Sequence, residues 1–149
     1  MSEQVTVHVE APVERVWELV SDVTRMGEWS PEVYEAQWVD GATGPAVGAR
    51  FKARNRRFGF VKYANTSIVV AAVPAQEFAF VQGSAEKFRM KWTYRLVPSG
   101  AGTDLTESWE SGMGSAATKA ALPPKRRKNL AVGMQRTLDR IKAAAESIT

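Results

Sequence analysis

The chain has 149 residues, of which 44% are hydrophobic and 24% charged, which is the composition of an ordinary soluble protein. We therefore expect a single domain over residues 1–149, large enough to bury a real core. The absence of cysteine excludes disulfides and thiol nucleophiles, and the single histidine argues further against a zinc site. The net charge of +4 is mild and leaves open whether a partner is anionic.

Targeting and cofactor features are also absent from the sequence. No apolar run approaches the length of a transmembrane span, and the first residues lack the charged-then-apolar build of a signal peptide. A chain without cysteine fits a reducing compartment. We therefore expect a cytoplasmic protein with no membrane insertion, no metal and no cofactor.

The N-terminal part of the chain predicts a strand followed by two short helices. Gln4–Glu10 alternates valines with polar residues, which is typical of a half-buried strand and turns His8 outward. A helix then opens at Pro12, because proline suits the first helical turn, and Val23–Glu28 predicts a second one. Two short helices in this position can support one end of a sheet.

The middle of the chain predicts about six strands separated by turns. Phe88–Val97 alternates most clearly, with large apolar residues on one face and mostly basic residues on the other. Arg50–Arg57 likewise sets Phe51, Ala53 and Asn55 against a basic face. The predicted strands are Glu32–Asp40, Arg50–Arg57, Asn65–Val73, Glu77–Gln82, Phe88–Val97 and Thr103–Ser111.

The last segment, Lys125–Ile148, predicts a long amphipathic helix. Its apolar residues recur every three or four positions, and at 1.5 Å per residue the helix would be roughly 36 Å long. We expect it to cover the sheet. Gly133 within it either lets the helix approach the sheet closely or leaves room for a ligand beneath it. The preceding segment Gly112–Pro124 would be a flexible lid. The stripe consists of Leu130, Met134, Leu138, Ile141, Ala145 and Ile148.

Several blocks of residues, in this order along the chain, resemble a known superfamily. They are Val9–Thr24 continued by Glu28–Pro31, then Gly48–Phe51, Trp92–Tyr94, Gly102–Ser108 and Gly133–Leu138. These blocks are similar to those of polyketide cyclase/dehydrase-type proteins of the START-like (Bet v 1-like, SRPBCC) superfamily. The resemblance implies an α+β helix-grip fold, in which a curved antiparallel sheet of about seven strands surrounds a long C-terminal helix and two short helices follow the first strand. It also implies an internal cavity for a small hydrophobic molecule, a lipid or a polyketide-like compound, without implying one chemistry.

Glu107 is the first candidate for chemistry in such a cavity. Strict alternation places it on one face with Leu105 and Trp109, and burial among apolar side chains should raise its pKa, as a general acid or base near neutral pH requires. Alternatively, Glu107 pairs with an arginine or a tyrosine hydroxyl, or a bulge turns it outward. Tyr94 either polarises a ligand carbonyl or anchors a core ring. The predicted cavity lining is Trp38, Phe51, Asn55, Phe80, Met90, Trp92, Leu105, Trp109, Leu130, Met134 and Leu138.

The sequence leaves three functions open. The first is binding of a small hydrophobic molecule, and the second is an aromatase/cyclase or dehydratase that uses Glu107 and Tyr94. The third is an RNA- or protein-binding module that uses the basic clusters Arg50–Arg57 and Lys125–Lys128. We expect these clusters not to form a nucleic-acid site, because the net charge is mild and we predict no exposed aromatic residues between them. Positive charge at a helix N-terminus opposes the macrodipole, so Lys125–Lys128 should not stabilise its helix.

Overall fold

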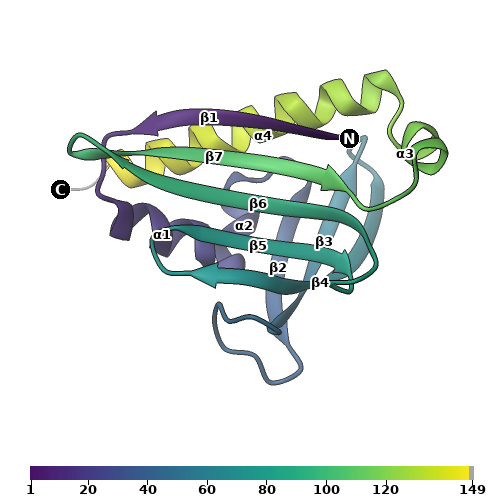
Figure 1. Ribbon diagram of the computed structural model, residues 1–149, viewed down its shortest axis with the longest axis horizontal. Helices are drawn as coiled ribbons and strands as arrows, with labels where there is room; N and C mark the ends of the chain where they lie inside the picture. The colour runs from purple at the N-terminus through teal and green to yellow at the C-terminus, as the bar shows by residue number, and fades with distance from the viewer. Residues whose placement is uncertain (148–149) are drawn as a thin grey trace.

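The computed structural model describes residues 1–147 as a seven-stranded antiparallel sheet curved around one long helix, α4 (Pro124–Glu146). The strand order is β1-β7-β6-β5-β4-β3-β2, and α4 runs along the inner side of the curve (Figure 1). The strands are β1 (Ser2–Val9), β2 (Val33–Val39), β3 (Arg50–Arg57), β4 (Val61–Val73), β5 (Glu77–Gly83), β6 (Phe88–Ser99) and β7 (Gly102–Ser111). This is the predicted helix-grip architecture.

Two short helices connect β1 to β2, as expected from the sequence. They are α1 (Val13–Ser21), which follows Pro12, and α2 (Met26–Trp29), with a 3₁₀ turn at Val23–Arg25 between them. The side chain of Asp22 caps that turn by accepting a hydrogen bond from the backbone N–H of Thr24 at 3.0 Å. α1 packs against α4 and β6 and thereby closes one end of the grip.

The segment Gly112–Pro124 differs from the expectation of a flexible connection, because it contains a helix, α3 (Ser115–Ala121). The alanines that indicated flexibility are also strong helix formers. Thr118 is buried and ties the helix to the end of β7, since its hydroxyl lies 2.7 Å from that of Ser111. Elsewhere the predicted boundaries shift slightly, and Ile148 of the predicted apolar stripe lies outside the described residues.

The two halves of α4 have different surroundings. In the C-terminal half, Leu138, Ile141 and Ala145 are almost fully buried and join the main core between the sheet and α1. In the N-terminal half, Leu130 and Met134 belong to a smaller cluster with residues of β6 and β7 and with Leu122. The predicted stripe therefore closes the core at one end of the molecule only.

Candidate ligand-binding site

A cavity of about 1510 Å³ lies between the sheet and the N-terminal half of α4, with α3 contributing to its wall. Gly133 lines it, and a Cβ atom placed there would meet only Pro31 Cγ, at 3.5 Å, which is an ordinary contact distance. A close approach of α4 to the sheet therefore does not require glycine at this position. The structure favours the other prediction, open space beneath the helix.

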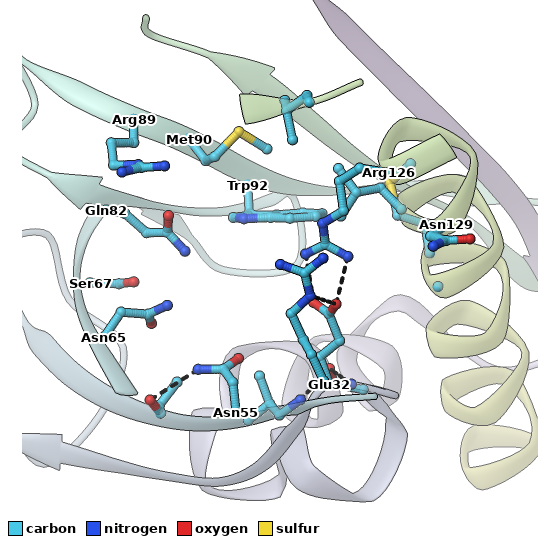
Figure 2. A pocket seen from close by; sticks show the side chains of 18 of the residues that line it. Glu32, Asn55, Asn65, Ser67, Gln82, Arg89, Met90, Trp92, Arg126 and Asn129 are labelled. Carbon is cyan, nitrogen blue, oxygen red and sulfur yellow. Dashed lines mark hydrogen bonds and ion pairs between the residues drawn. The ribbon is translucent and has the colours of Figure 1, made fainter. Parts of the chain in front are cut away.

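The lining divides into an apolar and a polar side (Figure 2). The apolar wall comes from β6 and α4 and consists of Met90, Trp92, Leu130 and Met134. The polar wall comes from β3, β4 and β5 and consists of Asn55, Asn65, Ser67 and Gln82. Asn55 Nδ2 donates a 3.2 Å hydrogen bond to the carbonyl of Ala53. Figure 2 draws no hydrogen bond between the side chain of Asn65, Ser67 or Gln82 and the other residues shown. The polar wall thus presents donors and acceptors to the cavity.

Glu107 on β7 lies directly opposite Tyr94 on β6, and both residues line the cavity. The pairing of β6 with β7 is regular from Gly102 to Ser111, so no bulge turns Glu107 outward. The hydroxyl of Tyr94 donates a 3.0 Å hydrogen bond to Glu107 Oε2. Glu107 Oε1 is buried and has no hydrogen-bond partner among residues 1–147.

The electrostatic state of Glu107 follows from these surroundings. The side chain is only 5% exposed, and burial raises its pKa to about 8, although the hydrogen bond from Tyr94 acts in the opposite direction. Near neutral pH the carboxyl group is therefore mostly protonated and can donate a hydrogen bond. Burial, together with the neighbouring carboxyl, also raises the pKa of Tyr94 well above its ordinary value.

Most of the residues predicted to line the cavity are found in its wall. Nine of them line it: Phe51, Asn55, Phe80, Met90, Trp92, Tyr94, Glu107, Leu130 and Met134. Four do not, and for these the expected position is corrected: Trp38, Leu105, Trp109 and Leu138. Leu105, Trp109 and Leu138 are fully buried and Trp38 is half-buried, so other side chains rather than open space surround them. Alternation along a strand predicts which face a residue occupies, and not how far the cavity extends along that face.

The four corrected residues have identifiable neighbours. Leu105 and Leu138 are fully buried in the main core at the end closed by α1. Trp38, on edge strand β2, is half-buried and packs edge-to-face on Phe51, with ring centroids 5.8 Å apart. Trp109 is fully buried in the small cluster that carries the apolar wall. Only Trp109 among the four therefore packs with residues of the apolar wall within the small cluster.

Sequence reasoning missed most of the polar wall. Asn65 and Ser67 begin a predicted strand, and alternation places them on the same face as Val69, which is buried. Gln82 ends the next predicted strand on the face of Phe80. The signal was therefore present as polar residues at inward positions of neighbouring strands. The pairing of β3 with β4 and of β4 with β5 then brings these polar residues together on one wall of the cavity.

An ion-pair cluster lies on another side of the cavity (Figure 2). Arg126, near the start of α4, donates two hydrogen bonds to Glu32, at 2.6 and 3.2 Å, and Arg57 Nε lies 3.9 Å from the same carboxylate. Arg127 also has a partner, because its Nε donates to the carbonyl of Leu122 at 3.1 Å. The positive charge of this helix N-terminus is thus partly offset by structural contacts.

Among residues 1–147, no group of three or more His, Cys, Asp or Glu side chains is arranged to hold a metal ion. Within the same described part of the chain, no helix combines the length and the apolar character needed to cross a membrane.

A sheet wrapped around one helix, with a cavity between them, defines a protein of the helix-grip class. Residues 2–146 match the family described as "Polyketide cyclase / dehydrase and lipid transport", and the chain belongs to this family. No curated protein matches the sequence.

Solved structures agree with this assignment. Protein CV1439 from Chromobacterium violaceum is 23% identical with a TM-score of 0.75, and the alignment covers 99% of both chains. The polyketide-cyclase-like protein Cgl2372 from Corynebacterium glutamicum is 32% identical with a TM-score of 0.68, covering 97% of this chain and 91% of that one. The di-domain aromatase/cyclase StfQ from the steffimycin biosynthetic pathway has a similar fold at 15% identity and a TM-score of 0.75; the alignment covers 97% of this chain and 50% of StfQ.

Proposed function

We propose that the protein binds a small, mainly hydrophobic molecule that carries oxygen atoms along one side. The observation that supports this is the cavity of about 1510 Å³ with its two unlike walls. Ligand sites are typically apolar with a few placed polar groups that set orientation. Here Met90 and Trp92 would contact the apolar body of the ligand, while Asn65, Ser67 and Gln82 would pair with its hydroxyl or carbonyl groups.

The two walls favour an oxygenated compound over a plain acyl chain. A saturated chain lying against the polar wall would leave amide and hydroxyl groups without partners, which costs free energy for each buried group. A polyketide-like molecule has carbonyl or hydroxyl groups at regular intervals and would satisfy them. We therefore expect oxygenated ring or polyketone compounds to bind more tightly than fatty acids of equal size.

Native mass spectrometry of the protein isolated from its own host tests this proposal, since it detects a bound small molecule directly. We expect Ser67→Trp, which places a large ring in the cavity, to lose the bound mass. Thr66→Trp is the matched control, because Thr66 is the adjacent residue of β4 and faces outward. The control should retain the bound mass. If neither wild type nor control carries or takes up any apolar compound, the proposal fails.

A second candidate function, catalysis of cyclisation or dehydration, is favoured by the pair Glu107–Tyr94. Glu107 Oε1 has no partner in the described protein and is available to a ligand, and burial raises the pKa of this carboxyl to about 8. A protonated carboxyl can protonate a carbonyl oxygen or a leaving hydroxyl, and the resulting carboxylate can accept a proton from carbon. Tyr94 would stabilise that carboxylate through its hydrogen bond rather than contact the ligand carbonyl itself.

We expect Glu107→Gln to lower the rate of cyclisation or dehydration of a synthetic polyketone thioester by about 10²–10⁴-fold, which is typical for loss of a general acid or base. Binding of the same compound should change little, because glutamine has nearly the same shape. Product analysis by chromatography, together with a binding titration, measures both effects. If wild type and Glu107→Gln give the same products at the same rate, the protein is a binder only.

A further inference from the structure

The turn between β3 and β4 exposes large aromatic side chains. Phe60 is 79% exposed and Phe58 71%, and the neighbouring Val61 and Tyr63 are also exposed. Isolated apolar residues on a surface are ordinary, but four within six consecutive residues form a patch. The expectation that no exposed aromatic residue lies next to the basic clusters is therefore wrong for Arg50–Arg57.

Folding alone does not explain this choice of residues. Phe58 has a φ of +56°, in the left-handed region that glycine or asparagine adopts more readily than a bulky aromatic residue. Gly59, the next residue, has a φ of +76°, and no heavy atom lies within 4 Å of where its Cβ would be, so the turn projects into open space. A strained and exposed phenylalanine points to a role outside the fold.

Charge is strongly segregated around this turn. Residues 41–76, which contain β3 and β4, carry six Lys or Arg and no Asp or Glu, and residues 111–138, which contain α3 and most of α4, also carry six and none. The rest of the chain therefore holds eight Lys or Arg and all sixteen Asp or Glu. The mild net charge of +4 conceals this separation.

Both acid-free segments border the cavity. Phe58, Gly59 and Tyr63 line it from the first segment, and Gly114, Ala117 and Arg136 line it from the second. Because Phe58 is largely exposed and also lines the cavity, the cavity opens to the surface beside the turn. Several cationic side chains line the cavity, among them Arg56, Arg57, Lys87, Arg89, Arg126 and Arg136. Glu32, which also lines it, is paired with Arg126.

We propose that the β3–β4 turn docks the protein on an anionic phospholipid surface, with Phe58 and Phe60 inserted at the interface and the cavity opening turned toward the bilayer. Arg56 and Lys62 flank the inserted residues; both lie over the ring of Tyr34, at 5.1 and 5.9 Å from its centroid, and have no ion pair among residues 1–147. Apolar insertion combined with basic residues is the usual basis of peripheral membrane binding. A projecting turn can enter a lipid interface, whereas a protein partner would have to provide a matching groove.

Co-sedimentation with vesicles tests the proposal. We expect the full chain at 150 mM salt to bind vesicles of phosphatidylcholine with 30% phosphatidylglycerol, and to bind pure phosphatidylcholine vesicles at least tenfold more weakly. Phe58→Asn/Phe60→Ser should lower binding to the anionic vesicles by about tenfold or more, and asparagine is compatible with the left-handed turn. Replacing Arg56 and Lys62 by glutamine should lower binding by about fivefold per residue.

The control is Val47→Ser/Val97→Ser, which removes two other exposed hydrophobic side chains, at 70% and 58% exposure, that do not line the cavity. It should bind anionic vesicles like wild type. Because the chain contains no cysteine, Val61→Cys can be labelled with an environment-sensitive dye and should shift to the blue on vesicle addition, whereas labelled Val97→Cys should not.

Three results would overturn the proposal. In the first, the wild-type protein stays in the supernatant with anionic vesicles. In the second, the phenylalanine variant binds as tightly as wild type, so that charge alone accounts for binding. In the third, RNA binds tightly at 150 mM salt, the phenylalanine substitutions abolish that binding, and vesicles are ignored. That last pattern would identify the same surface as a nucleic-acid site.

Discussion

Leu138→Ala will lower the free energy of unfolding by about 2–5 kcal/mol, the range measured when a buried leucine is truncated in a packed core. Leu138 is fully buried, and it belongs to the main core rather than to the cavity wall. Its neighbours in that core belong to the sheet and to α1, so the space left by the shortened side chain cannot collapse easily. Chemical denaturation followed by circular dichroism measures the change.

Val132→Ala on the same helix is the control for this prediction. Val132 is 45% exposed, and alanine is a better helix former than valine, so this substitution should change the stability by less than about 0.5 kcal/mol in either direction. The comparison separates burial from helix propensity. A loss well under 1 kcal/mol for Leu138→Ala would mean that α4 is peripheral and would contradict the fold.

Glu107 will make the protein less stable as the pH rises from about 4.5 to about 8. The pKa of Glu107 is raised from 4.5 to about 8 in the folded state, so in this window the folded protein keeps a proton that the unfolded chain has released. Proton binding by the folded state makes the free energy of unfolding fall by about 1.4 kcal/mol for each pH unit. The stabilisation is fully present below pH 4.5 and is lost as the pH passes about 8.

Thermal or denaturant unfolding at several pH values, for wild type and for Glu107→Gln, measures this effect. The difference in free energy of unfolding between wild type and Glu107→Gln should change with pH between about 4.5 and about 8, and should be constant outside that range. The exposed His8, whose pKa is raised chiefly by its hydrogen bond to Asp104, titrates in both proteins and cancels in the difference. Parallel curves, or a Glu107 carboxyl that titrates by NMR at or below about 4.3, would remove this residue as a general acid.

The order and type of the main elements follow from patterns in the amino-acid sequence. Alternation in Arg50–Arg57 and Phe88–Val97 predicts strands, and the three-to-four spacing from Leu130 to Ala145 predicts a helix, because these periods reflect backbone geometry alone. The inward position of Glu107 followed from the same alternation, since its neighbours at two-residue spacing are Leu105 and Trp109. These predictions needed no knowledge of which strands pair.

Which residues line the cavity depends on the tertiary structure. Trp38, Leu105 and Leu138 face inward like Met90, but whether an inward side chain meets a neighbour or open space depends on where α1 and α4 cross the sheet. The hydrogen bond of Tyr94 to Glu107 likewise depends on the register of β6 against β7.

The helix α3 and the charge distribution show the same division. The composition of residues 115–121 is compatible with either a flexible segment or a helix. The structure shows a helix there, and the hydroxyl of Thr118 lies within hydrogen-bond distance of that of Ser111 at the end of β7. The two acid-free segments could be counted in the sequence, but they are separated by 34 residues that carry Glu77 and other acids. The tertiary structure brings them to one cavity, because Phe58 and Tyr63 of the first segment and Arg126 and Arg136 of the second line it.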